Sequence, residues 1–391
     1  MKNVKIATYL SFLWRSWFWL GIWVFYYLRF TDYAGIGFLE AVMITTSTLG
    51  EIPTGAIADI LGKKKAVSIA FFLGALGNLI MAFAPNYWVL IASIITMTIG
   101  GAFYSGSLEA LVYDGLKEEN KAGLYEKVIG RMTTMQNLGM AFAGIVGGLL
   151  YKWHVSLPFL AVTFAYAIGF ILSLKLTEPN IDTEQYSWDR FVRQNAEGFR
   201  QIFSSRRLTF MALALLIPGS FMIATENVLN DATAVELGFN SIQLGIFATV
   251  LYLFGVLVSE KTAWVMGKLS STWLYVGAIA VYSATLLFMP KATFVVGAVL
   301  LLTRYGIQTI FGNYESVRIN AITDSKYRAT TLSTFSLLRN IPYVVTATFI
   351  GILMNHYTAK LFSLYFGLIF LMVIGIFALT RYFMTQSEIK L

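Results

Sequence analysis

Long apolar runs follow one another along the whole chain, and short polar or charged segments separate them. Crossing the hydrocarbon core of a membrane takes about 20 apolar residues in a helix. Runs this long can cross only as helices, because a helix bonds all of its own backbone groups. The pattern predicts twelve membrane-spanning helices, at residues 7–28, 37–58, 66–84, 88–113, 128–150, 157–176, 208–230, 242–260, 272–289, 292–316, 329–354 and 361–383.

The composition also indicates a membrane protein. Of the 391 residues, 57% are hydrophobic and 13% are charged, whereas a soluble domain is about half apolar and about a quarter charged. Cysteine is absent, which excludes a disulfide framework, a thiolate metal site and a cysteine nucleophile. The net charge of +8 does not indicate a nucleic-acid partner, because the basic residues lie in short loops between the apolar runs.

The distribution of lysine and arginine predicts the orientation of the chain. Most of them fall in loops on one side of the predicted helices, and only Arg29, Lys152, Lys291 and Lys360 fall in loops on the other. Basic loops stay in the cytoplasm, so we expect both termini there. The longest polar stretch, 178–207, is predicted to be a cytoplasmic linker between an N-terminal bundle (1–177) and a C-terminal bundle (208–391). Its aromatic residues predict an amphipathic helix on the membrane surface: Trp188, Phe191 and Phe199.

The two halves of the chain share residues at a constant separation in sequence. The matching pairs are Gly62 with Gly267, Phe83 with Phe288, and Pro85 with Pro290. Glu109 and Glu315 match with a shift of one further residue. Each pair falls at the same place in the helix pattern, which indicates a duplicated unit of six helices.

One polar motif stands between the second and third predicted helices. It has the form G-x-x-x-D-x-x-G-K-K and consists of Gly55, Asp59, Gly62, Lys63 and Lys64. The motif resembles the signature loop of the major facilitator superfamily. The flanking stretches LEAVMITTSTLGEIPTG and SGSLEALVYDGLKE are similar to its bacterial drug-exporter-type branch.

The resemblance implies an all-α membrane protein with 12 transmembrane helices in two pseudo-symmetric six-helix bundles. It implies a secondary active transporter in the bacterial cytoplasmic membrane, working as a monomer by alternating access. Helices 1, 4, 7 and 10 would surround a central cavity for a small-molecule substrate. No cofactor is expected, since the proton gradient would supply the energy.

The resemblance is incomplete in two helices. The fifth predicted helix has the glycine spacing of proton-coupled drug antiporters, but Ala143-Gly144 replaces their central Gly-Pro. Thr96 stands where those antiporters carry an arginine in the fourth helix. The glycines either allow close helix packing or take part in coupling, and the sequence leaves both interpretations open.

Charged residues near the predicted helix ends form a candidate cytoplasmic gate around the motif. Lys63 or Lys64 can pair with Asp114, and Asp59 can lie at the N-terminus of the eleventh helix, where the dipole favours a carboxylate. An exposed pair contributes only about 0–1 kcal/mol, so the gate is expected to act as a network. The other charged residues expected at this surface are Glu109, Arg131, Glu315, Arg318 and Asp324.

Three arginines lie inside the predicted membrane helices: Arg15, Arg304 and Arg339. A charge there costs roughly 3 kcal/mol on insertion scales, so each needs a partner or a function. They either line a cavity for an anionic or zwitterionic substrate or are neutralised internally. The other candidate residues of the cavity are Glu226, Asn227 and Trp14.

Two acidic residues are candidates for carrying a coupled proton. Glu226 has no obvious partner in the sequence and is the first candidate. Glu51 is the second, although it shares a helix face with Gly55 and Asp59 and can belong to the gate instead. The chain has no HExxH or GxSxG motif, so no enzyme is expected. His154 and His356 lie in predicted outer loops, and we expect no metal site.

These observations predict a proton-coupled antiporter that exports a small amphipathic molecule. The excess of arginine keeps a second possibility open on the same fold: an importer or exchanger of an organic anion, or a lipid flippase.

Overall fold

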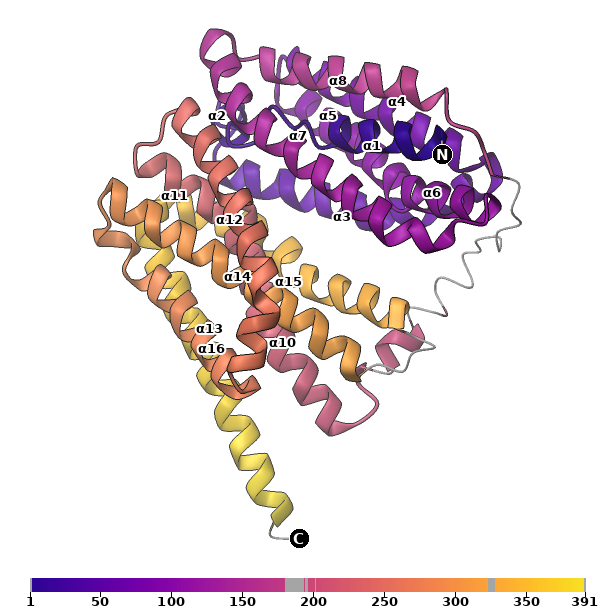
Figure 1. The fold of residues 1–391 in the computed structure, drawn as a ribbon. Coiled ribbons are helices and arrows are strands. Elements are labelled where there is room, and N and C mark those ends of the chain that lie inside the picture. Colours follow the sequence, from indigo (N-terminus) through magenta and orange to yellow (C-terminus); the bar gives the residue numbers. More distant parts are fainter. Residues whose placement is uncertain (1, 180–192, 194–195, 201, 323–327, 390–391) are drawn as a thin grey trace. The chain divides into compact units, whose positions relative to one another are not determined.

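The fold is entirely helical within the part of the chain that this computed structural model describes, residues 2–179, 193, 196–200, 202–322 and 328–389 (Figure 1). These residues form two compact units. The N-terminal unit comprises the described residues of 1–32, 38–191 and 240–253, and the C-terminal unit those of 33–37, 192–239 and 254–391. The all-α membrane fold predicted from the apolar runs is confirmed, since each predicted run overlaps one or more helices.

The first part of the chain supplies the following helices: α1 (Lys2–Trp14), α2 (Trp23–Tyr27), α3 (Tyr33–Leu61), α4 (Lys63–Ala82), α5 (Tyr87–Tyr104), α6 (Ser107–Glu118), the 3₁₀ turn η1 (Ala122–Leu124), α7 (Tyr125–Trp153) and α8 (Leu157–Ser173). The second part supplies α10 (Arg206–Ala224), the π-helical turn η2 (Thr225–Leu229), α11 (Asn230–Glu236), α12 (Ser241–Lys268), α13 (Ser271–Leu287), the 3₁₀ turn η3 (Met289–Lys291), α14 (Phe294–Ile322), α15 (Arg328–His356) and α16 (Ala359–Ile389). Among the described helices, 7 segments are long and apolar enough to cross a membrane by length and composition alone.

The predicted first helix, 7–28, is wrong as a single element. Helix α1 ends at Trp14, tight turns follow, and α2 begins only at Trp23. The hydroxyl of Tyr166 donates a hydrogen bond of 2.8 Å to the backbone carbonyl of Trp14. It also accepts one of 3.0 Å from the indole of Trp17. A carbonyl at a helix end has no partner within the helix, so this side chain stabilises the break.

The predicted fourth helix, 88–113, is also divided. Helix α5 ends at Tyr104 and α6 begins at Ser107. Between them, Gly106 adopts a φ of 72°, a left-handed conformation that favours glycine over other residues. The apolar pattern does not reveal this break, because both helices are apolar on either side of it.

In the N-terminal unit, α4 packs between α5 and α8, and α1 packs on α7 and α8. The glycines of α7 face other backbones: a side chain at Gly147 would collide with the carbonyl of Phe18. Gly144 lies against the backbone of Gly245 in α12 in the same way. The geometry is therefore that of close helix packing, one of the two interpretations that the sequence left open.

In the C-terminal unit, α10 packs on α15, and α13 packs on α14 and α16. Tyr282 of α13 is fully buried and donates a hydrogen bond of 3.0 Å to the carbonyl of Phe221. The predicted amphipathic helix of the linker rests on Trp188 and Phe191, which lie outside the described residues. Phe199 is exposed within the helical residues 196–200.

Candidate functional site

An ion pair inside the C-terminal unit joins α14 to α15. The guanidinium Nη1 of Arg339 lies 2.8 Å from Glu315 Oε1, with the two side chains 29% and 6% exposed. The other carboxylate oxygen, Oε2 of Glu315, and Nε of Arg339 are buried without a hydrogen-bond partner among the described residues. A buried pair is stabilising only when its remaining polar atoms are also bonded, so this pair is only partly satisfied.

The position of Glu315 corrects one prediction. The sequence placed it at the cytoplasmic surface near a helix end, but it is buried and paired with Arg339. The reason is that α14 continues to Ile322, so Glu315 lies two turns inside the helix.

Helix α10 approaches this ion pair closely. A methyl group on Gly219 would lie 2.7 Å from Glu315 Oε2 and 2.9 Å from Cδ of Arg339. The neighbouring Ser220 donates a hydrogen bond of 3.0 Å to the backbone carbonyl of Arg339. Three helices therefore meet at the pair, and only a residue without a side chain fits between them.

Glu226 lies in the π-helical turn η2, which continues α10. Its side chain is exposed, and it interacts electrostatically with Arg339 and with Tyr305. Tyr305 belongs to α14 and Arg339 to α15, so Glu226 lies within electrostatic range of both helices. The neighbouring Asn227 donates a hydrogen bond of 3.0 Å to the carbonyl of Ile223. Single π turns occur often at functional sites, and this one holds an accessible carboxylate in a membrane-spanning segment.

Gln308 of α14 bonds the backbone beside this π turn. Its amide nitrogen donates to the carbonyl of Met222 at 3.0 Å and to Thr225 Oγ1 at 2.8 Å. Its amide oxygen is buried without a partner among the described residues. Sequence reasoning missed this residue, because a lone glutamine in an apolar run carries no spacing signal. Its contacts indicate that it fixes the register of the turn that holds Glu226.

Arg304, eleven residues into α14, is bonded quite differently from Arg339. It is fully buried, and its guanidinium donates to Thr285 Oγ1 at 3.1 Å, to the carbonyl of Thr285 at 2.9 Å and to Asn230 Oδ1 at 2.8 Å. All these acceptors are neutral. In this conformation Arg304 is satisfied internally, which is the second of the two interpretations that the sequence left open.

The cavity candidates of the N-terminal unit are Trp14 and Arg15. Trp14 is 9% exposed and stacks on Tyr104 and Tyr166, with ring centres 4.0 Å and 5.0 Å away. Arg15 lies in the break after α1, with its guanidinium 4.6 Å from the ring centre of Trp17. No carboxylate of the described residues forms an ion pair with it. Trp14 is thus a packing residue here, and Arg15 keeps an unneutralised charge.

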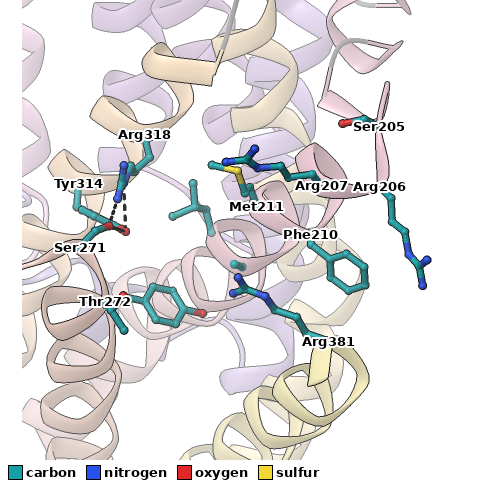
Figure 2. A pocket seen from close by; sticks show the side chains of 13 residues that line it. Ser205, Arg206, Arg207, Phe210, Met211, Ser271, Thr272, Tyr314, Arg318 and Arg381 are labelled. Atoms are coloured by element: carbon teal, nitrogen blue, oxygen red, sulfur yellow. Dashed lines mark hydrogen bonds between the residues drawn. The ribbon is translucent and has the colours of Figure 1, made fainter. Parts of the chain in front are cut away.

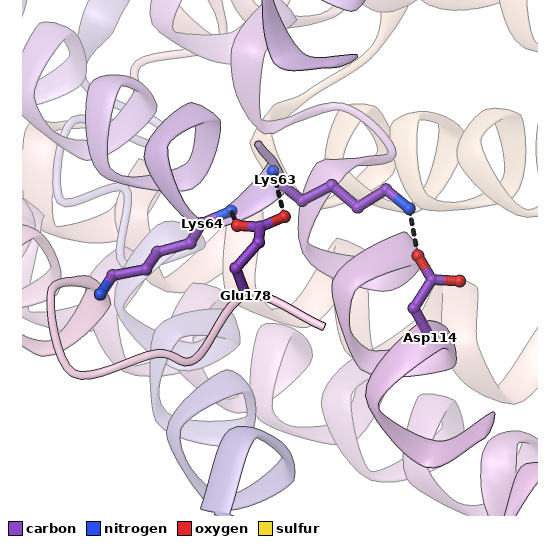
Figure 3. Close-up of polar contacts among 4 residues, drawn as sticks. All are labelled: Lys63, Lys64, Asp114 and Glu178. Atoms are coloured by element: carbon purple, nitrogen blue, oxygen red, sulfur yellow. Dashed lines mark hydrogen bonds and ion pairs between the residues drawn. The ribbon is translucent and has the colours of Figure 1, made fainter. Parts of the chain in front are cut away.

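The motif from Gly55 to Lys64 makes polar contacts with two acidic residues within the N-terminal unit. Lys63 pairs with Asp114 of α6, as Figure 3 shows. Glu178 accepts the backbone N–H groups of Lys63 and Lys64, both at 2.7 Å. A carboxylate at a helix N-terminus interacts favourably with the dipole. Gly62, just before α4, has a φ of 93°, which favours glycine at this turn.

The sequence predicted the pair between a lysine of the motif and Asp114, but it missed Glu178, which lies far along the chain. The remaining gate candidates Glu109 and Arg131 are exposed on α6 and α7, and Glu51 is exposed on α3. Asp324 and the side chain of Asp59 lie outside the described residues.

Comparison with known proteins identifies the family. The model of the Major Facilitator Superfamily matches residues 6–345. An uncharacterized MFS-type transporter of Bacillus subtilis, YxaM, is 25% identical over 239 residues, 58% of this chain and 57% of that protein. The multidrug resistance protein MdtH of Edwardsiella ictaluri is 27% identical over 175 residues, 45% of this chain and 40% of that protein. These matches therefore span only about half of the length of the curated relatives.

Solved structures share the fold over nearly the whole chain. The nucleoside transporter NupG superposes with a TM-score of 0.80 at 17% identity, covering 96% of this chain and 97% of that one. A POT family transporter in complex with 5-aminolevulinic acid gives a TM-score of 0.74 at 13% identity, covering 96% and 95%. At these identities the likeness establishes the fold alone.

Proposed function

The chain belongs to the Major Facilitator Superfamily and is a membrane transporter, and we propose that it exports a small amphipathic molecule in exchange for protons. The residue that carries this proposal is Glu226. It is an exposed carboxylate in a membrane-spanning segment of the C-terminal unit, and it interacts electrostatically with Arg339. The similarity to the multidrug resistance protein MdtH supports export rather than import.

The proposed mechanism uses competition for one guanidinium. When Glu226 is ionised, its charge acts on Arg339 together with that of Glu315. When Glu226 is protonated, Arg339 interacts with Glu315 alone. Proton binding at Glu226 thus changes the electrostatic balance among α10, α14 and α15. Any such change that differs between inward-facing and outward-facing states shifts their populations.

A second candidate function is the transport of an organic anion. Arg15 supports it, since no described carboxylate neutralises its charge and the backbone around it is irregular. Irregular backbone in a membrane protein is tolerated where it is buried or lines a cavity. An arginine there can bind a carboxylate or phosphate group in a fork-shaped contact.

In both cases the basic loops support a chain with both termini in the cytoplasm. We further propose that the Lys63–Asp114 pair belongs to a cytoplasmic gate, together with Gly55, Asp59 and Glu51. No cofactor is required, because a proton gradient supplies the energy.

Transport into sealed inside-out vesicles tests the two functions against each other. An imposed inside-acid gradient should drive uptake of a lipophilic cationic dye if the chain is a proton-coupled exporter. The export proposal would be overturned by two results together: the gradient drives uptake of no amphipathic probe, and the protein exchanges an organic anion. Loss of that exchange in Arg15→Ala would then favour the second function.

A further inference from the structure

A basic pocket of about 860 Å³ lies in the C-terminal unit, between α10, α13, α14 and α16. Four arginines line it, and no aspartate or glutamate does so among the residues that the structure describes. Figure 2 shows Arg207, Arg318 and Arg381 on different walls, whereas Arg206 points away from the centre. A hollow lined by charges of one sign concentrates the electrostatic potential, so the pocket attracts anions. The proposed transport mechanism does not use it.

Arg318 has neutral hydrogen-bond partners inside this pocket. Its Nε donates to the hydroxyl of Tyr314 at 3.3 Å, and another guanidinium nitrogen donates to the hydroxyl of Ser271. The guanidinium also lies 5.5 Å from the ring centre of Tyr314. These partners are neutral and orient the group without cancelling its charge. Arg207 takes part in none of the ion pairs found among the described residues.

An apolar groove of about 360 Å³ adjoins the basic pocket. It lies between α10, α13 and α16 and shares Ala214, Tyr275 and Arg381 with the pocket. The rest of its wall is mostly apolar and comes from α16, with Ile374, Phe377 and Ala378. The basic pocket thus continues into a smaller apolar groove, and Arg381 lines both.

We propose that the pocket and the groove together bind one anionic phospholipid, as a resident ligand and not as cargo. Its phosphate lies among the arginines, whose guanidinium forks match phosphate oxygens, and part of an acyl chain lies in the groove. Basic pockets between membrane helices are known to bind anionic headgroups. A soluble phosphate would occupy the basic pocket but leave the groove without an occupant.

The surface around this site also fits lipid. On α13, Trp273 is 71% exposed, and on α16, Leu379 is 59% exposed. Both helices therefore present apolar side chains outward beside the groove. The site is formed by the C-terminal unit alone, so the orientation proposed above decides only which leaflet supplies the lipid.

Native mass spectrometry of the full-length protein in detergent tests the proposal, with phosphatidylglycerol, phosphatidylcholine and inorganic phosphate added separately. Phosphatidylglycerol should bind more tightly than phosphatidylcholine. Combining Arg207→Gln with Arg318→Gln should weaken its binding roughly tenfold or more, since two charge-assisted bonds are lost. Ala378→Trp, which fills the groove from an exposed position, should weaken it as well.

Lys268→Gln is the matched control, since it removes a cation at the end of α12 that does not line the pocket. It should leave binding of phosphatidylglycerol unchanged, and size-exclusion chromatography verifies that each variant is folded. Equal binding of phosphatidylglycerol by the control and the double arginine variant would overturn the proposal. Displacement of the lipid by millimolar inorganic phosphate, with no effect of Ala378→Trp, would instead identify a site for soluble anions and reject the lipid.

Discussion

Arg304 and Arg339, both within membrane-spanning segments of the C-terminal unit, lie in regions of opposite character. Around Arg304, three hydrogen bonds to Asn230 and Thr285 hold a side chain with no exposed surface. Around Arg339, the ion pair to Glu315 leaves two buried polar atoms without a hydrogen-bond partner among the described residues, and the arginine side chain is partly exposed. A fully bonded charge has one stable arrangement, whereas a partly bonded one can accept another partner. The first region is suited to holding helices together and the second to changing state.

Removing Arg304 should have the largest effect on stability. Arg304→Ala leaves the carboxamide of Asn230 and the carbonyl of Thr285 without their donor and opens a cavity. We expect a loss of about 3 kcal/mol or more, since each unsatisfied buried group costs about 1–3 kcal/mol. Thermal unfolding of the purified protein in detergent measures it. If Arg304→Ala is as stable as the wild type, the hydrogen bonds of Arg304 do not hold the helices together and the contrast with Arg339 fails.

Adding a methyl group beside Arg339 should have the next largest effect. Gly219→Ala places a carbon 2.7 Å from Glu315 Oε2, so the ion pair must shift, at a cost of about 1–3 kcal/mol. The matched control is Gly277→Ala in α13, where a methyl group meets nothing within 4 Å. That change should stabilise the helix by up to about 1 kcal/mol. If Gly219→Ala lowers the unfolding temperature and Gly277→Ala raises it, the packing described here is supported. Equal changes of the unfolding temperature in the two variants would contradict it.

Weakening the Arg304 region by one acceptor should have a smaller effect. Thr285→Val removes the hydroxyl that accepts from Arg304 Nε but keeps the carbonyl and Asn230 as acceptors. We expect a loss of about 1 kcal/mol, clearly below that of Arg304→Ala. If both substitutions destabilise equally, the hydroxyl and not the whole set of acceptors stabilises the arginine.

Several features of the fold were predictable from the sequence, because each depends on local composition. The apolar runs indicated where most of the helical segments lie, and the motif from Gly55 to Lys64 indicated the family. The break after Trp14 was not predictable, because it depends on Tyr166, a side chain distant in sequence that bonds the free carbonyl. The division at Gly106 left no trace in hydropathy, because a left-handed glycine does not change the apolar pattern.

The candidate site was only partly predictable. The sequence singled out Glu226, Arg304 and Arg339 because an ionisable residue in an apolar run is unusual. It could not distinguish Arg304 from Arg339, since their partners lie on other helices and include neutral residues such as Thr285. The sequence pattern predicted that the tenth helix ends at residue 316, and Glu315 was therefore expected at the surface. Tertiary contacts, not local pattern, decide these cases.

The most direct test of the account is proton coupling in Glu226→Gln, measured in proteoliposomes beside Glu260→Gln, which removes an exposed carboxylate from α12. The free energy of unfolding of Glu226→Gln should differ from that of the wild type by no more than about 0.5 kcal/mol. The reason is that the Glu226 side chain is exposed and makes no hydrogen bond among the described residues. The account predicts that Glu226→Gln still exchanges substrate across the membrane at equilibrium but no longer accumulates it in response to a pH gradient, whereas Glu260→Gln does both. Gradient-driven accumulation at the wild-type rate in Glu226→Gln would contradict it.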